Sequence, residues 1–313
     1  MTVALRQYFH LKARKIGLRR YLTRSIRCFP HAMLSICLML SFFVASPSPA
    51  FAFKERHLSL TYDVYYGGIK ATSLEIDITL SDLAYRLKSR VVARGPFGWI
   101  TGFIADAMSE GYLGDNEIRP REHNARSKWF GEQRSVALRP GTNGIVDTAV
   151  VPLPEKDDRD PVTLTSTIGT LDPLSAFLKA ARDIQRNDAC EQTVPIFDGR
   201  RRYNLIFSDT IRTSIKGEHY SGPVLRCRLD LTRIAGFSHK PFMPRPKEPP
   251  EAFIWLARIN PDVPPIPVRL QVDSSIATTV IHLTGVSREQ SDELMSSMPI
   301  EKIHDRIDRS RVR

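Results

Sequence analysis

The most reactive side chains in this sequence are its four cysteines, at positions 28, 37, 190 and 227. Cys190 and Cys227 flank a predicted hairpin and could either form a disulfide or remain thiols. A metal site is a weaker interpretation, because neither cysteine has a second Cys or a His at ligand spacing. The histidines are scattered through the chain without such spacing.

The sequence contains none of the common catalytic signatures. A G-x-S-x-G turn, an H-E-x-x-H helix, a phosphate-binding loop and a dinucleotide-binding glycine set are all missing. We therefore expect no enzymatic activity, no cofactor and no metal site. An envelope hydrolase is therefore the least favoured of the three functions that we consider for this chain.

The net charge of +11 is concentrated at the start of the chain. Eight of the 45 lysines and arginines, and none of the 34 acidic residues, fall within residues 1–52, so the rest of the chain carries only about +3. This distribution argues against a nucleic-acid partner.

Residues 1–52 have the three parts of a secretory signal peptide. A basic segment reaches Arg27, an apolar run spans residues 32–45, and Ala50-Phe51-Ala52 provides small residues at a cleavage site. We predict cleavage after Ala52 and a periplasmic protein. The alternative is an uncleaved anchor, but the apolar run is shorter than the roughly 20 residues that a span needs, so no stable membrane span is expected after cleavage.

Export leaves Cys190 and Cys227 as the only cysteines of the mature chain, in an oxidising compartment. We predict that they form a disulfide closing a loop of about 37 residues, which contributes roughly 3–4 kcal/mol on the loop-entropy model. Two buried free thiols are the alternative.

The mature chain is dominated by alternating apolar and polar residues. Residues 58–66, 74–80 and 85–93 each alternate with a period of two, which is typical of antiparallel strands with one wet face. Further strands are expected at 119–127, 132–138, 144–150, 194–197, 200–207, 224–231, 252–258, 267–273 and 278–283.

One amphipathic helix interrupts these strands. Asp172 is a plausible N-cap and Pro173 a first helical residue, and Leu174, Phe177 and Ile184 are among the apolar residues that recur at helical spacing. A single helix must bury this stripe against the sheet. We therefore predict a mainly β fold, a curved antiparallel sheet or half-barrel that wraps one amphipathic helix.

We expect a single domain over residues 53–286. Within it, residues 156–161 are interpreted as a solvated turn, since they lack the ligand spacing of a calcium loop. The proline-rich residues 240–250 are expected to form a surface loop. The charged residues 287–313 are interpreted as a disordered tail.

Asp198-Gly199 predicts a tight turn between two strands. The following Arg200-Arg201-Arg202 could capture an anion such as a lipid headgroup. On a strand these side chains would alternate between faces, which makes Arg201 the candidate anion contact. A solvated hairpin arm is the alternative.

Residues 95–104 are rich in Gly and apolar side chains, and suit neither a regular strand nor a stable helix. Phe97, Trp99 and Phe103 could cover an apolar cavity or touch a membrane surface, and we name them as candidate apolar ligand contacts. A plug at one end of the sheet is the alternative.

The sequence contains four longer motifs, Tyr62-Asp63-Val64-Tyr65-Tyr66-Gly67-Gly68, Ile118-Arg119-Pro120, Leu171-Asp172-Pro173-Leu174-Ser175-Ala176 and Phe197-Asp198-Gly199-Arg200-Arg201. Together, over roughly residues 58–285, they resemble the bacterial family DUF3108. The resemblance implies an exported protein of a Gram-negative bacterium. It implies no activity, because the family has no established one.

The expected fold also resembles the periplasmic lipoprotein carriers, whose concave face holds acyl chains. That resemblance implies a lipid or another apolar ligand in the concavity, which is our first hypothesis. The alternative is a non-enzymatic scaffold, with other cell-envelope proteins as partners and a core filled by its own side chains. An empty cavity of some hundreds of Å³ would separate the two.

Overall fold

The computed structural model describes residues 55–153, 159–239 and 249–287. These residues form one antiparallel sheet of 13 strands in the order β7-β6-β5-β4-β3-β2-β1-β13-β12-β11-β10-β9-β8. The strands are β1 (Arg56–Tyr66), β2 (Ile69–Leu80), β3 (Ala84–Ala93), β4 (Ile104–Leu113), β5 (Ile118–Trp129), β6 (Glu132–Pro140), β7 (Val146–Val151), β8 (Gln192–Phe197), β9 (Arg202–Ile215), β10 (Gly222–Ala235), β11 (Glu251–Ala257), β12 (Ile266–Asp273) and β13 (Thr278–Ser287).

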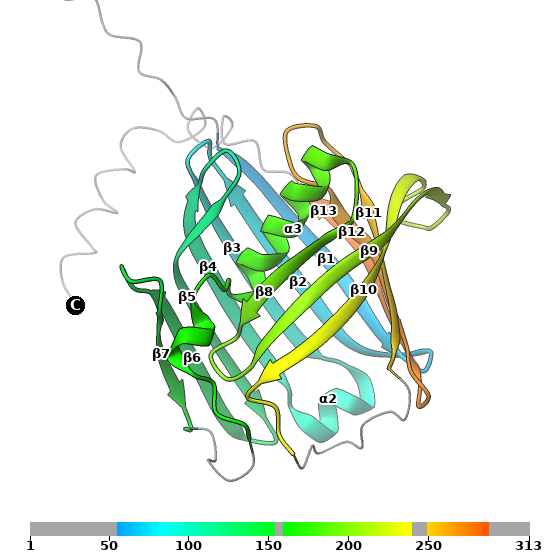
Figure 1. Ribbon diagram of the computed structural model, residues 1–313. Helices are drawn as coiled ribbons and strands as arrows, with labels where there is room; N and C mark the ends of the chain where they lie inside the picture. Colours follow the sequence, from blue (N-terminus) through cyan, green and yellow to red (C-terminus); the bar gives the residue numbers. More distant parts are fainter. Residues whose placement is uncertain (1–54, 154–158, 240–248, 288–313) are drawn as a thin grey trace, which may run out of the picture. The chain divides into compact units, whose positions relative to one another are not determined.

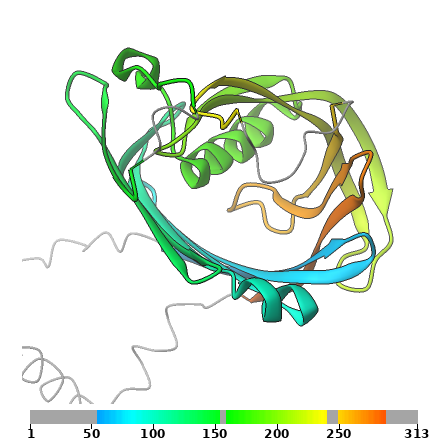
Figure 2. The ribbon, with the colours of Figure 1, turned by 90° about the horizontal axis from the view of Figure 1, so that it is seen from below.

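The sheet curves around the helix α3 (Pro173–Asn187), which lies in its concavity (Figures 1 and 2). The sheet is not closed, because its edge strands β7 and β8 do not pair with each other. The predicted half-barrel around one amphipathic helix is therefore confirmed.

Helix α3 begins and packs as its sequence predicts. The Asp172 carboxylate accepts hydrogen bonds from the backbone N–H groups of Leu174 and Ser175, and Pro173 opens the first turn. Ile184 is 1% exposed and packs with residues of β8, β9, β10 and β11. Phe177 is only half-buried, so it occupies the edge of this cluster.

Alternation places one face of each strand on the core. Leu58, Leu60 and Tyr62 of β1 are buried, and the alternate residues of β12 and β13 join them in a second cluster. Cys227 of β10 points inward, as predicted, and is fully buried.

The predicted hairpin at Asp198-Gly199 is present, but its turn is longer than two residues. Strand β9 begins at Arg202, so Arg200 and Arg201 belong to the turn and do not alternate across a strand. The Asp198 carboxylate accepts from the backbone N–H groups of Arg200 and Arg201, and this local hydrogen bonding replaces a two-residue primed turn.

Residues 95–104 differ from the expectation of no regular structure. The helix α2 (Gly95–Thr101) forms there and ends at Gly102, whose φ of 57° is left-handed. Strand β4 then starts at Ile104, where the sequence pattern predicted no strand.

The gap between β7 and β8 is spanned by residues 159–172. Leu171 pairs with the free edge of β8, donating its N–H to the Pro195 carbonyl and accepting from the Phe197 N–H. The 3₁₀ helix η2 (Leu164–Thr167) lies beside β7, where the Val146 N–H donates to the Thr167 hydroxyl. We call this gap the seam.

Several predictions concern residues beyond those described. The signal peptide at 1–52, the tail from 288 and most of the proline-rich loop, 240–248, lie outside the described residues. In the described ranges, no helix is long and apolar enough to cross a membrane.

Candidate functional site

The predicted disulfide is confirmed. Cys190 and Cys227 are bonded, with their Cα atoms 5.7 Å apart, and both are fully buried. The bond ties the residues before β8 to β10 across the intervening β9. Its role here is structural, because neither sulfur is accessible to a ligand.

The three candidate apolar contacts lie at one end of the sheet. Phe97 and Phe103 pack edge-on against the Trp129 ring, with ring centroids 5.7 and 5.3 Å apart, respectively. Trp99 is 88% exposed. None of the three lines the apolar cavity beside α3 or the groove at the seam between β7 and β8.

Arg201, the candidate anion contact, is engaged within its own turn. Its Nε donates to the Asp198 carboxylate at 2.8 Å, and its guanidinium lies 5.9 Å from the Phe237 ring centre. Arg200 turns the other way, toward the seam, and donates to the Pro152 carbonyl.

A buried polar cluster joins helix α3 to strands β3, β4 and β5. Ser109 donates to the Asp172 carboxylate at 2.6 Å, and the His123 Nδ1 lies 2.8 Å from the Ser109 hydroxyl and 3.3 Å from that carboxylate. The Tyr85 and Ser175 hydroxyls bond at 2.7 Å.

Ser109, His123 and Asp172 match the residue types of a hydrolytic triad, but their geometry differs from one. In a triad, the two ring nitrogens of the His contact the acid and the nucleophile separately. Here the same Nδ1 faces both groups, and Ser109 is completely buried. The arrangement suits anchoring of the helix N-terminus better than attack on a substrate.

Opposing effects set the pKa of Asp172. Burial acts to raise it, but the neighbouring His123 and the hydrogen bonds from Ser109 and Ser175 outweigh burial and hold this pKa below its ordinary value. Burial also raises the pKa of Tyr85 well above its usual range. Sequence reasoning identified Asp172 only as a helix cap and missed its partners, which come from other strands.

The concavity itself is nearly full. A cavity of about 40 Å³ remains between α3, the inner faces of β1–β3 and the loop before β12. Its lining is apolar and includes Leu60, Ile78, Leu174, Phe177 and Ile266. This volume is far below the 300–1,000 Å³ typical of ligand pockets.

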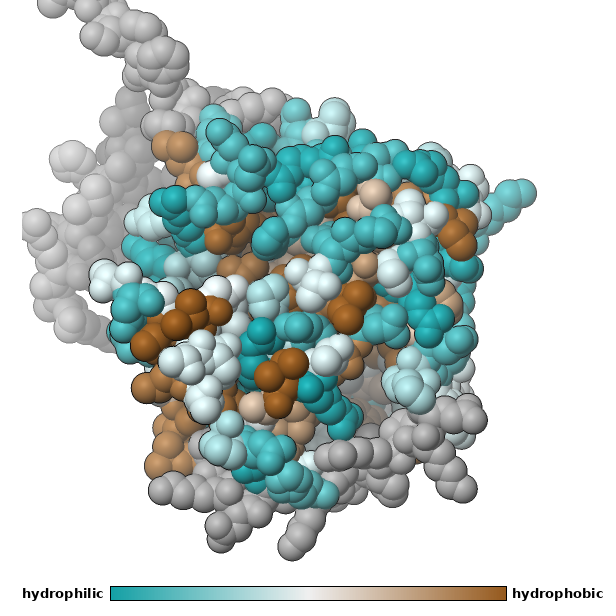
Figure 3. Space-filling model, in the orientation of Figure 1, coloured by the Kyte–Doolittle hydropathy of each residue, from teal (hydrophilic) through white to brown (hydrophobic). Residues whose placement is uncertain are grey.

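A much larger groove, of about 600 Å³, opens at the seam. Its apolar lining includes Val146, Leu153, Val162, Leu164 and Phe197. Leu153 and Leu164 are exposed, and Figure 3 shows apolar residues gathered over this side of the molecule, near β7 and η2. We call this cavity the seam groove.

Two arginines also line the seam groove. Arg159 donates to the Gly236 carbonyl and Arg200 to the Pro152 carbonyl, so both hydrogen bonds go to neutral acceptors. Burial lowers the pKa of the Arg200 guanidinium, and the nearby Arg134 and Arg159 lower it further. Asp160 also lines the groove, where its carboxylate lies 3.5 Å from the His239 Nε2. An anionic group bound beside Arg200 would relieve repulsion between the arginines.

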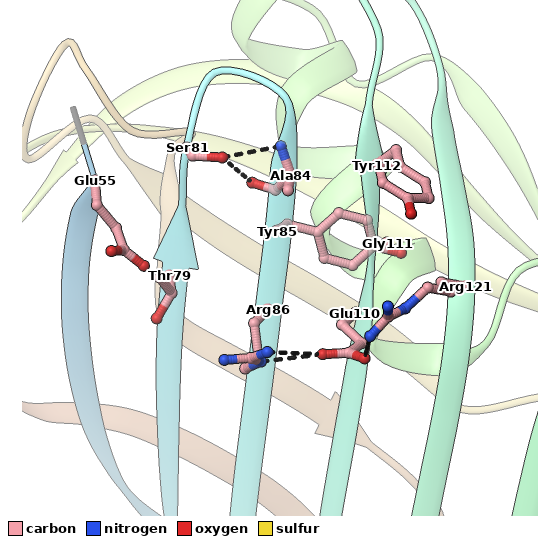
Figure 4. A pocket seen from close by; sticks show the side chains of 10 residues that line it. All are labelled: Glu55, Thr79, Ser81, Ala84, Tyr85, Arg86, Glu110, Gly111, Tyr112 and Arg121. Atoms are coloured by element: carbon pink, nitrogen blue, oxygen red, sulfur yellow. Dashed lines mark hydrogen bonds and ion pairs between the residues drawn. The ribbon is translucent and has the colours of Figure 1, made fainter. Parts of the chain in front are cut away.

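A smaller surface cleft, of about 240 Å³, lies over β3 and β4 (Figure 4). The Glu110 carboxylate sits between Arg86 and Arg121, and their hydrogen bonds, with that of Arg121 the stronger, lower the pKa of Glu110 despite some burial. Because Glu110 is already paired with these two arginines, we interpret the cluster as a structural ion pair and not as a ligand site.

A wider cleft, of about 760 Å³, separates the β9–β10 connection from β1, β12 and β13. Its lining mixes apolar residues such as Val268 and Val280 with the polar residues Asp63, Arg269 and His282. Burial and the nearby Arg269 lower the pKa of His282. Within the ranges that the structure describes, no group of three or more His, Cys, Asp or Glu residues could hold a metal ion.

Fold and site together define a class of protein: an open, half-barrel β domain built around an internal helix, with its accessible apolar groove at the seam of the sheet. Residues 61–284 match the model of DUF3108, described as a protein of unknown function. The chain belongs to this family.

None of the curated proteins matches the chain. Among solved structures, it is similar to a beta-barrel-like protein of the domain of unknown function DUF1849 from Brucella abortus. The two share 12% sequence identity with a TM-score of 0.45, over 76% of this chain and 100% of that one.

Proposed function

We propose that this protein is a non-enzymatic, exported cell-envelope protein that binds an amphiphilic ligand in the seam groove. The observation that carries the proposal is the groove of about 600 Å³, apolar along its walls and lined by Arg159 and Arg200. An acyl chain would replace water along the walls, and an anionic headgroup would pair with the arginines. The ligand site is thus moved from the concavity to the seam.

Periplasmic localisation, with the signal peptide cleaved after Ala52, is part of the same proposal. The buried Cys190–Cys227 bond supports it, since such bonds persist mainly in oxidising compartments. The N-terminal sequence of the protein purified from the periplasm would test the cleavage site. A mature chain that begins before residue 53 would contradict it.

A fluorescent fatty acid, cis-parinaric acid, tests the seam groove directly. Leu164→Asp places a negative charge on an exposed groove wall, where it repels the fatty-acid anion and disrupts the apolar surface, and should weaken binding at least tenfold. Phe177→Trp enlarges a side chain that lines the concave cavity and should leave binding unchanged. The reverse pattern would return the site to the concavity, and no binding by the wild type would reject a fatty-acid site.

The arginines are tested with the same probe. Arg200→Ala should weaken binding of the fatty-acid anion about tenfold while leaving the binding of a long-chain alcohol within twofold, because only the anion pairs with the guanidinium. Arg201→Ala is the matched control, since Arg201 is held by Asp198 outside the groove lining. Equal losses for acid and alcohol would exclude headgroup recognition by Arg200.

A second candidate function is a scaffold of the cell envelope with no ligand. The observation that favours it is the nearly full concavity, where α3 leaves only about 40 Å³. Native mass spectra of the periplasmic protein before and after organic extraction separate the two functions. A reproducible extractable mass of lipid size supports the amphiphile site, whereas a clean apo mass favours the scaffold.

A further inference from the structure

Exposed apolar side chains are concentrated at the end of the sheet that carries α2. Trp99 and Ile100 of α2 are 88% and 70% exposed. Ile69 at the start of β2 and Phe130 in the β5–β6 turn are 66% and 52% exposed. Figure 1 shows α2 at this end, with the β1–β2 and β5–β6 turns. We call these four residues the α2 patch.

The α2 patch is held in place by the sheet. The Arg94 N–H donates to the Ala71 carbonyl at the start of α2, and the Phe130 N–H donates to the Thr101 carbonyl at its end. Behind the patch, Phe97 and Phe103 pack against the Trp129 ring, which Phe130 of the patch also contacts. The exposed side chains are therefore presented on a supported surface, and their exposure is not a result of a loose loop.

Charge at this end is suited to an anionic partner. Exposed Arg94 precedes α2 and donates to the Ser73 hydroxyl, an uncharged acceptor, and exposed Lys128 lies two residues before Phe130. Exposed Glu132 also lies at this end and pairs with Arg134. At the opposite end of the same strands, acids and arginines are paired with each other, Asp82 with Arg56 and Glu117 with Arg119.

Trp and other amphipathic aromatics favour the boundary between hydrocarbon and water, and nearby cations add attraction to anionic lipid headgroups. The α2 patch has both properties, because it is flanked by Arg94 and Lys128, two exposed cations that pair with no carboxylate among the described residues. We propose that the α2 patch docks the protein on the surface of an anionic phospholipid bilayer. Trp99 and Ile100 enter the interface, and Arg94 and Lys128 face the headgroups.

Sedimentation with vesicles tests this docking. Vesicles of phosphatidylethanolamine and phosphatidylglycerol at a 3:1 ratio should bind the wild-type protein, and phosphatidylcholine vesicles should bind it at least fivefold more weakly. Trp99→Ser/Ile100→Ser should weaken binding at least tenfold. Leu83→Ser/Tyr112→Ser, which alters two exposed apolar residues at the opposite end, should change it less than twofold.

Two further measurements make the test specific. Brominated phospholipid should quench the tryptophan fluorescence of the wild type, and this quenching should be lost in Trp99→Phe, which keeps Trp129 and Trp255. Raising the salt concentration should weaken binding, since it screens the headgroup attraction. The groove variant Leu164→Asp should still bind vesicles, so docking and the proposed ligand site can fail independently.

The proposal is overturned if the two double variants bind vesicles equally well. It is also overturned if wild-type binding does not depend on phosphatidylglycerol. Sedimentation velocity without lipid tests whether a second copy of this chain occupies the patch instead. A dimer that Trp99→Ser/Ile100→Ser abolishes, without any vesicle binding, would assign the patch to a second copy of this chain.

Discussion

The carboxylate of Asp172 organises the interior through a single oxygen. Its Oδ1 accepts from the Ser109 hydroxyl and from the N–H groups of Leu174 and Ser175, while Oδ2 is buried with no partner among the described residues. One ionised side chain thus fixes both the start of α3 and its position on β4. Its charge state therefore matters for the fold.

Acid should destabilise the protein partly through Asp172. Its pKa in the folded state is below the ordinary value of 3.8, so its stabilisation is complete above pH 4 or so and is lost as the pH falls through the folded pKa. Asp172→Asn should lower the free energy of unfolding at pH 7 by about 1–3 kcal/mol and flatten its acid dependence. Urea unfolding from pH 7 to pH 3 measures both effects. Asp106→Asn, at the exposed ion pair with Arg90, should lower it less; an equal effect would contradict the special role of Asp172.

Removing the disulfide should cost stability without altering the surface. Cys190→Ala/Cys227→Ala opens a loop with a sequence separation of 37 residues, and we expect the free energy of unfolding to fall by about 3–4 kcal/mol. Guanidinium unfolding of the variant and the wild type measures the loss. Because both sulfurs are buried, reductant should act on the wild type only after denaturant is added. Rapid reduction of the native protein would contradict this burial.

At the scale of the element, the sequence predicts structure where apolar and polar residues contrast. Strands β1, β2 and β3 and helix α3 have this contrast, and they were found from it. Strand β4 was missed because its inward residues, Ala105, Ala107, Ser109 and Gly111, are small and give little apolar–polar contrast. They are small because α3 packs over β4, a tertiary cause that no local pattern contains.

The seam groove was missed for a related reason. Its walls combine β7, the residues around η2 and the turn after β8, and each of these segments resembles an ordinary loop or edge on its own. The sequence pointed to the arginine run and to Arg201 as its candidate anion contact, whereas Arg200 is the member that lines the groove. Which of its members faces the groove depends on the four-residue turn, and the Asp-Gly pair alone predicts a shorter one.

Gly111 should tolerate no side chain. A Cβ there would lie 2.3 Å from the Arg119 carbonyl oxygen and 2.9 Å from the Tyr85 ring, so the backbone of β5 would have to move. Gly111→Ala should lower the free energy of unfolding by about 1–3 kcal/mol, as overpacking does in other cores. Thermal unfolding measures it. Gly114→Ala is the control, since its closest contact is the flexible Glu117 side chain, and equal melting temperatures would contradict the close approach.

At the scale of the whole domain, the sheet lacks strand pairing at the seam, between its edge strands β7 and β8. Residue Leu171 protects the edge of β8 by pairing with it, whereas β7 is a six-residue strand with β6 as its one strand neighbour. The turn at Gly199 packs on Val136 of β6 and brings the two sides of the seam together. Side-chain contact at the seam takes the place of the backbone ladder of a closed barrel.

Hydrogen exchange should reveal this difference. Amide hydrogens of β7 should exchange at least tenfold faster than those of β1, because β1 is paired on both sides by β2 and β13. Mass spectrometry of peptides covering residues 146–151 and 56–66 measures the two rates. Equal protection would mean that the seam is closed more firmly than its contacts indicate.

The pairing of β1 with β13 has a consequence for how the chain is assembled. Strands β1 to β7 and β8 to β13 are two runs in which each strand pairs with its sequence neighbour, and they meet where Ser59 lies opposite Ser287. Each run can form as it emerges from a ribosome or translocon, but their joint must wait for the last strand. Until then, the middle of the finished sheet is an open edge that another strand could occupy. A circular permutant with its ends at the seam would turn this final joint into an ordinary hairpin and remove that wait.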